Sequence, residues 1–207
     1  FFGGSVNGTH LVCSNMGDDC FDFDQGYNGK LQFLLSLQGD NTDIGSDSNG
    51  IESDNDSSAM DKLPRTQPVI SNMTLIGSEG GKHGLRLRRG TGGNYSNVIV
   101  TGFTEKCIAL DDAATFALGT ATAQGEVLSM THSFVGECAG GQFDDTAGDA
   151  YLVSNWFLNA TGNEAGNPDL NGYLPAATSP LLNGGKAPAD AFFRKVQYRG
   201  AFAGQHD

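Results

Sequence analysis

The chain has 207 residues, with 30 glycines and 12 lysines and arginines against 24 aspartates and glutamates. A net charge of −12 argues against nucleic acid or an anionic membrane surface as a partner, because binding phosphate groups needs a basic surface. No apolar run reaches the roughly 20 residues of a membrane span, and frequent glycine between short apolar runs favours an all-β chain.

The predicted strands come in pairs that repeat along the chain. The first strand of each pair is apolar and ends in Gly or Cys. A loop of variable length follows. A small residue then leads into the second strand, which has the pattern apolar–x–apolar and is followed by a polar residue. The pattern is clearest where Asn72 aligns with Asn97 and Gly77 with Gly102. In chain order the pairs are 9–13 with 20–24, 34–39 with 50–54, 70–77 with 84–87, 95–102 with 107–110, and 132–136 with 141–145.

Constant strands joined by loops of variable length are typical of a parallel β-solenoid, whose coils stack at the strand spacing. We therefore predict an all-β, right-handed parallel β-helix of about five or six coils over residues 1–145. Residues 111–125 predict a short helix or loop inserted in the last coil. Residues 146–207 predict a last strand, with Trp156 in it, and an irregular closing segment over the end of the solenoid.

The stretch GDDCFDFD (17–24) crowds carboxylates against aromatic rings. Because strand side chains alternate, we expect Phe21 and Phe23 to point inward and Asp22 outward. Stacked coils then align the outward residues in columns, in which opposite charges on neighbouring strands stabilise each other. The middle column is predicted to hold Asp22, Glu52, Arg86, Ala109 and Gln142, and the exit column Asp24, Asp54, Arg88, Asp111 and Asp144. Pairing of Arg86 with Glu52, and of Arg88 with Asp54 and Asp111, would give these columns a purely structural role.

A bound cation is the alternative explanation of the same carboxylates. Asp22, Asp24, Glu52 and Asp54 lie on two adjacent predicted strands with no basic residue among them. Ca²⁺ takes six to eight oxygen ligands, so these four residues are candidate ligands. The loop 39–56 could add Asp40, Asp43, Asp47 and Asp56.

Four cysteines without a CxxC spacing favour two disulfides in an exported protein over a metal site. Cys13 and Cys20 bracket one predicted turn. Cys107 and Cys138 fall at similar places in consecutive coils. We therefore predict the pairs Cys13–Cys20 and Cys107–Cys138.

Catalytic motifs are weak by comparison. The fragments NTD (41–43), KHG (82–84), RLR (86–88) and DD (111–112) resemble the four short motifs of the polygalacturonase family, but in a different order. Asp43 and Asp111 would lie about three coils apart, too far to flank one glycosidic bond. A lyase would need Ca²⁺ and a free basic residue, whereas both arginines of RLR have acids nearby.

Several segments together resemble one group of proteins. GDDCFDFDQGYNGKLQF, GLRLRRGTGG…NVIVTGF, ATSPLL and DAFF…VQYRGAF are similar to secreted bacterial right-handed β-helix proteins of the pectate-lyase-like superfamily. The resemblance covers nearly the whole chain and implies a β-helix and export. It implies no catalytic residues.

These observations favour a non-catalytic structural or surface module, secreted or at the cell surface, stabilised by disulfides and with Ca²⁺ as a candidate ligand. The competing class is a carbohydrate-active β-helix, a polysaccharide lyase or a carbohydrate-binding module.

The opening FFGGSVNGTHLV is apolar and strand-like, and an uncovered solenoid end exposes unpaired backbone groups. We therefore expect this end to meet further coils or a second copy stacked end to end into a filament.

Overall fold

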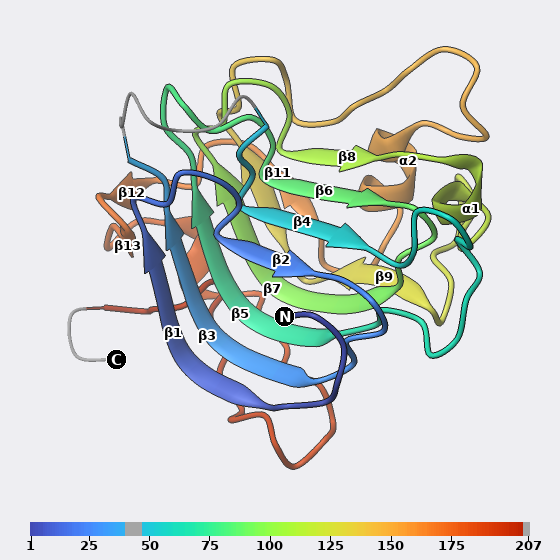
Figure 1. Ribbon diagram of the computed structural model, residues 1–207. Helices are drawn as coiled ribbons and strands as arrows, with labels where there is room; N and C mark the ends of the chain where they lie inside the picture. Colours follow the sequence, from blue (N-terminus) through green and yellow to red (C-terminus); the bar gives the residue numbers. More distant parts are fainter. Residues whose placement is uncertain (40–46, 205–207) are drawn as a thin grey trace.

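The computed structural model describes residues 1–39 and 47–204, and Figure 1 shows that strands dominate this part of the chain. Within it, no helix has the length and apolar character needed to cross a bilayer. The helical segments are α1 (Ala113–Phe116), α2 (Val153–Leu158) and the 3₁₀ turn η1 (Pro180–Leu182). The strands are β1 (Gly8–Ser14), β2 (Phe21–Phe23), β3 (Lys30–Leu37), β4 (Ile51–Asp54), β5 (Val69–Ile76), β6 (Leu85–Arg88), β7 (Gly93–Thr101), β8 (Ile108–Leu110), β9 (Leu128–Thr131), β10 (Phe134–Gly136), β11 (Glu164–Ala165), β12 (Leu170–Asn171) and β13 (Leu174–Pro175).

Two parallel sheets share the chain alternately. The first runs β1-β3-β5-β7-β10-β11, with β9 also paired to β7, and the second runs β2-β4-β6-β8. Each pass of the chain therefore adds one strand to each sheet, as the repeat predicts. The register confirms the alignment of the first four short strands, because Phe21 lies opposite Ile51, Ile51 opposite Leu85, and Leu85 opposite Ile108. In the long strands Cys13 lies opposite Ser36, not Gly39. The number of coils and their handedness stay predictions.

The long strands of the first sheet bend at one residue each. Asn72 and Asn97 lie at these bends with φ of 57° and 56°, a left-handed conformation that asparagine tolerates better than most residues. The Asn97 Nδ2 donates to Asn72 Oδ1 at 3.3 Å, so the amides stack as the sequence alignment predicts. Asn72 is fully buried and is therefore closed to glycosylation in the folded protein.

Side chains from both sheets face each other in one core. The Phe23 ring is fully buried and stacks on Tyr27, with centroids 5.4 Å apart. Alternation along the short strands leaves Asp22 exposed between two buried rings. The inner stack predicted from the sequence is present, and its members are Phe21, Phe23, Ile51, Leu85, Leu87, Ile108 and Leu110.

A helix, not a strand, contains Trp156. Val153, Trp156 and Phe157 recur at i, i+3 and i+4 and are all buried, which is the spacing of an amphipathic helix. α2 packs against β8, and its Phe157 ring lies 5.3 Å from that of Phe143. The last coil is thus covered by α2, while α1 falls within the insertion where a short helix was predicted.

The C-terminal segment runs along the side of the first sheet instead of over its end. Gln32 binds the backbone of Arg194 twice, through Nε2 to the carbonyl at 2.8 Å and through Oε1 from the amide at 2.7 Å. The amide of Lys186 donates to Asn97 Oδ1 at 2.7 Å. The segment therefore crosses several long strands near their bends, where it satisfies buried side-chain amides.

The fifth strand pair is shifted from its predicted alignment. Phe143, not Gly141, bridges Ile108, so Gln142 and Asp144 do not occupy the middle and exit columns. Ala109 does align with Arg86, but it is 1% exposed because α2 packs against its strand. The outward columns end at β8.

We expect Phe23→Ala to destabilise the protein by about 3–5 kcal/mol, the usual effect of truncating a buried phenylalanine. Chemical denaturation measures the change. Leu63→Ala is the control, because Leu63 is 78% exposed. Phe23→Leu, which keeps most of the volume, should lose less than the alanine variant. Equal stabilities of the two alanine variants would contradict the inward assignment of β2.

Candidate functional site

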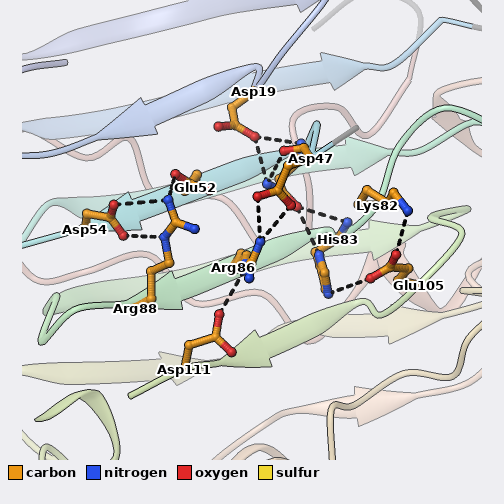
Figure 2. Close-up of polar contacts among 11 residues, drawn as sticks. Asp19, Asp47, Glu52, Asp54, Lys82, His83, Arg86, Arg88, Glu105 and Asp111 are labelled. Atoms are coloured by element: carbon orange, nitrogen blue, oxygen red, sulfur yellow. Dashed lines mark hydrogen bonds and ion pairs between the residues drawn. The ribbon is translucent and has the colours of Figure 1, made fainter. Parts of the chain in front are cut away.

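The outward face of the second sheet gathers most of the charged residues singled out from the sequence. Inward positions of β2, β4 and β6 hold apolar side chains apart from the buried Ser53, and the alternating positions project Asp22, Glu52 and Arg86 from the opposite face. Figure 2 shows that Arg86 and Arg88 are connected to acids of neighbouring strands and loops. We take this face as the candidate site because it combines acids, arginines and a histidine.

Arg88 joins two acids of β4. Its Nε donates to Asp54 Oδ1 at 2.7 Å, its Nη2 donates to Asp54 Oδ2 at 3.2 Å, and the same Nη2 bonds Glu52 Oε2. Arg89 adds a further bond to Asp54 Oδ2 at 2.5 Å. Asp54 is only 4% exposed, and two guanidinium groups balance its charge.

Arg86 joins acids that follow or precede other strands. Its Nε donates to Asp111 Oδ2 at 2.8 Å, and its Nη1 donates to both Asp47 oxygens at 2.7 and 2.8 Å. The predicted pair of Arg88 with Asp54 is confirmed, whereas the other two partners are exchanged: Arg88 binds Glu52, and Arg86 binds Asp111. The cause is the length of the side chain, because arginine reaches the diagonal neighbour two positions along the next strand.

A second chain of contacts precedes the short strands. The Asn49 backbone amide and Nδ2 donate to Asp19 Oδ1 at 2.7 and 2.8 Å. Asn49 Oδ1 lies 3.1 Å from His83 Nδ1, and His83 Nε2 lies 3.3 Å from Glu105 Oε2. Lys82 donates to the other oxygen of Glu105 at 2.7 Å.

The sequence analysis missed this second chain, although the register contains it. Asp19, Asn49 and His83 each stand directly before the small residue that leads into a short strand. They therefore form a column of their own. The column becomes visible when the strand alignment is extended by two residues towards the N-terminus of each short strand.

Burial and crowding shift the pKa of several acids on this face. Burial raises the pKa of Glu52 from 4.5 to about 7, with a further increase from Asp19 and an opposing effect of Arg88. Burial also raises the pKa of Asp19 to about 6, against the hydrogen bonds from Asn49. The pKa values of Asp22 and Asp24 are raised too, first by burial. At Glu52, burial and the neighbouring acids thus outweigh the ion pair with Arg88.

Two of the four predicted calcium ligands are engaged by an arginine. Glu52 and Asp54 are bound by Arg88, whereas Asp22 and Asp24 form no ion pair within residues 1–39 and 47–204. In that part of the chain no group of three or more His, Cys, Asp or Glu residues could hold a metal ion. We therefore derive no chemistry through a bound metal, and calcium binding stays a prediction from the sequence.

The loop residues named as additional ligands are dispersed. Asp47 binds Arg86. Asp56 binds Lys62 Nζ at 2.7 Å and accepts backbone amides of the following turn. Asp40 and Asp43 lie outside the described residues, and so does the NTD fragment.

Two disulfides flank the charged face, and they are the pairs expected from the sequence. Cys13, in β1, bonds Cys20, directly before β2. Cys107, directly before β8, bonds Cys138, after β10. Each bond ties the first sheet to the second.

Comparison with known proteins gives one family. A family model described as a pectate-lyase-like beta helix domain matches residues 1–170. No curated protein and no solved structure matches the chain at the significance required. The matched range includes both sheets, the charged face, both disulfides and α2.

The raised pKa of Glu52 predicts a pH-dependent stability. Between its usual value of 4.5 and about 7, the folded protein binds this proton more tightly than the unfolded chain. The free energy of unfolding therefore falls as the pH rises through this window and changes no further above it. Glu52→Gln removes the titration, so the variant should gain stability relative to the parent as the pH rises from about 5 to about 8.

Urea unfolding at both pH values measures this difference. Glu79→Gln is the control, because Glu79 is exposed and should follow the parent protein. Parallel pH profiles of the parent and Glu52→Gln would contradict the assigned pKa.

Proposed function

This chain belongs to the family of pectate-lyase-like β-helix domains, and we propose that it is a non-catalytic structural or surface module that acts outside the cell. The proposal rests on one observation: the two arginines of β6 are both engaged in ion pairs. Arg86 and Arg88 each bind two carboxylates. A guanidinium held in this way stabilises the stack and is poorly placed to accept a proton from a substrate.

The cysteines support an extracellular location. Both disulfides connect the two sheets, and such bonds persist mainly in oxidising compartments. By limiting the unfolded chain, they also stabilise a fold that has to survive without cellular maintenance. Secretion or exposure at a cell surface is therefore part of the proposal.

A carbohydrate-active role is the second candidate, favoured by the protonation behaviour of two acids. Burial raises the pKa values of Asp19 and Glu52 to about 6 and about 7, and Asp19 further raises that of Glu52. Perturbed carboxyl groups of this kind are typical of acid–base sites. Cleavage of a polysaccharide along this face would use Glu52 as the proton donor.

Incubation with uronic-acid polysaccharides separates the two functions. We expect no release of reducing ends or unsaturated products from the purified protein, in buffers with or without Ca²⁺. Release that Glu52→Gln abolishes would overturn the structural proposal and support the carbohydrate-active one. Glu79→Gln again serves as the matched control, because it removes the same charge from an exposed position.

The exposed end of the first sheet supports self-association as part of the structural role. Within residues 1–39 and 47–204, β1 pairs with β3 alone, and apolar side chains gather around its other edge: Phe2 is 78%, Val6 63%, Val12 65% and Met16 47% exposed. A free edge with apolar side chains is a template for pairing with another strand. Since α2 packs against β8 at the other end of the second sheet, we propose that two copies meet through their β1 ends and close as a dimer.

Light scattering over a range of concentrations tests this association. The parent protein should dimerise, and Phe2→Asp should shift the equilibrium toward the monomer. Leu158→Asp is the control, because Leu158 is 49% exposed and lies in α2, which packs against β8 at the other end of the second sheet. A protein that remains monomeric at high concentration would refute the proposal.

A further inference from the structure

A pocket on the outer side of the first sheet has chemistry unlike the rest of the molecule. It measures about 310 Å³ and lies between β7, β9 and the C-terminal segment 186–189. Alternation along β9 turns Leu128 and Met130 into the core and leaves Ser129 and Thr131 facing out. The sheet thus supplies the floor, and the C-terminal segment supplies one wall.

The wall is held by specific contacts. The amide of Lys186 donates to Asn97 Oδ1 at 2.7 Å, and the carbonyl of Gly184 accepts from His132 Nδ1 at 3.1 Å. Because a carbonyl can only accept, Nδ1 carries the proton, and Nε2 is left for other partners. These contacts fix the backbone at Lys186 and leave its long side chain at the rim.

The pocket contains no acid, although the chain carries a net charge of −12. Lys186 and His132 are its basic lining residues. Within the described residues, the Lys186 ammonium forms no ion pair and no hydrogen bond. The other face of the molecule shows the contrast, because Arg86 and Arg88 there are each bound by two acids.

Hydroxyl groups complete a set of donors. Ser129 Oγ accepts from Asn94 Nδ2 at 2.8 Å, so its own hydrogen remains to be donated. The Thr131 hydroxyl has no partner among the residues that the structure describes. Lys186, Ser129 and Thr131 are single-point donors that converge from two sides of the pocket. No arginine offers the planar fork that matches a carboxylate.

We propose that this Lys186 pocket binds a tetrahedral oxyanion, the phosphate or sulfate group of a small molecule. A tetrahedral anion presents oxygens in several directions, and it can accept hydrogen bonds from an ammonium group on one side of the pocket and from hydroxyl groups on the other. A second pocket of about 310 Å³ shares Ser129 and Thr131 and is lined by uncharged polar side chains, among them Gln124, Asn159 and Thr161. It offers room and hydrogen bonds for a hydroxylated remainder of the ligand. The proposal is independent of the proposed structural role.

Isothermal titration with inorganic phosphate and with sulfate, at constant ionic strength set by chloride, tests the pocket. We expect one site that both anions fill in competition. Lys186→Gln should weaken binding about tenfold or more, since a charge-assisted hydrogen bond contributes about 1.5–3 kcal/mol. Thr131→Val, which removes only a hydroxyl, should weaken it by a smaller factor.

Lys195→Gln is the matched control, because it removes the same charge from an exposed position of the same C-terminal segment. It should bind phosphate as the parent protein does. Equal weakening by both lysine variants, full competition by chloride, or no binding of either anion would overturn the proposal.

Titration with glucose 6-phosphate, with glucose as the control without phosphate, then distinguishes the two sources of the bound group. Tighter binding than inorganic phosphate indicates a sugar ester as the ligand, and equal binding indicates the free anion. Melting curves of Lys186→Gln should match the parent, which keeps the comparison free of folding effects.

Discussion

In-register parallel stacking is the constraint on which the rest of the structure depends. Each strand places its side chains directly over the same positions of its neighbours, about 4.8 Å away. This stacking stabilises apolar side chains, as in the inner stack from Phe21 to Ile108. It destabilises a column of acids, because like charges on neighbouring strands repel each other. The two arginines of β6 relieve that repulsion on their own side of the sheet, where Arg88 binds Glu52 and Asp54. Towards β2 no arginine follows, and the pKa values of Asp22 and Asp24 are raised.

The same stacking creates a polar problem at the bends of the long strands. Asn72 and Asn97 turn their amides outward in a fully buried column, and buried amides need partners. The C-terminal segment supplies them with its backbone: Asn72 Nδ2 donates to the carbonyls of Tyr198 and Gly200, both at 3.1 Å. The segment is therefore bound as an extended peptide along the stack. Its path also builds the wall of the Lys186 pocket, so the bends of the sheet indirectly position that site.

The sequence predicted those features that alternation and repetition determine. Asp22 between Phe21 and Phe23, and small residues before each short strand, were sufficient to align the first four short strands. The directly opposite pair Arg88–Asp54 was predicted, but the contacts of Arg88 with Glu52 and of Arg86 with Asp111 are diagonal, and a strand alignment does not distinguish them. α2 was mistaken for a strand because Val153, Trp156 and Phe157 stand in a short apolar run, in which helical and strand patterns are hard to separate. The path of the C-terminal segment depends on its backbone contacts with buried amides, and no pattern of residue types encodes it.

The perturbed acids carry less functional weight than their pKa values suggest. Functional sites concentrate shifted pKa values, but structural networks of charges shift them as well. Here the shift of Glu52 begins with burial and continues with Asp19, both of which follow from stacking acids on adjacent coils. The Cys13–Cys20 disulfide lies directly beside Asp18, Asp19 and Asp22 in the chain. This bond joins β1 to the segment before β2 within one coil, so it fixes the first coil but does not bridge β2 and β4, where the acids face each other. The shifted pKa values thus follow from burial and from the stacking of acids, and they do not by themselves indicate a catalytic face.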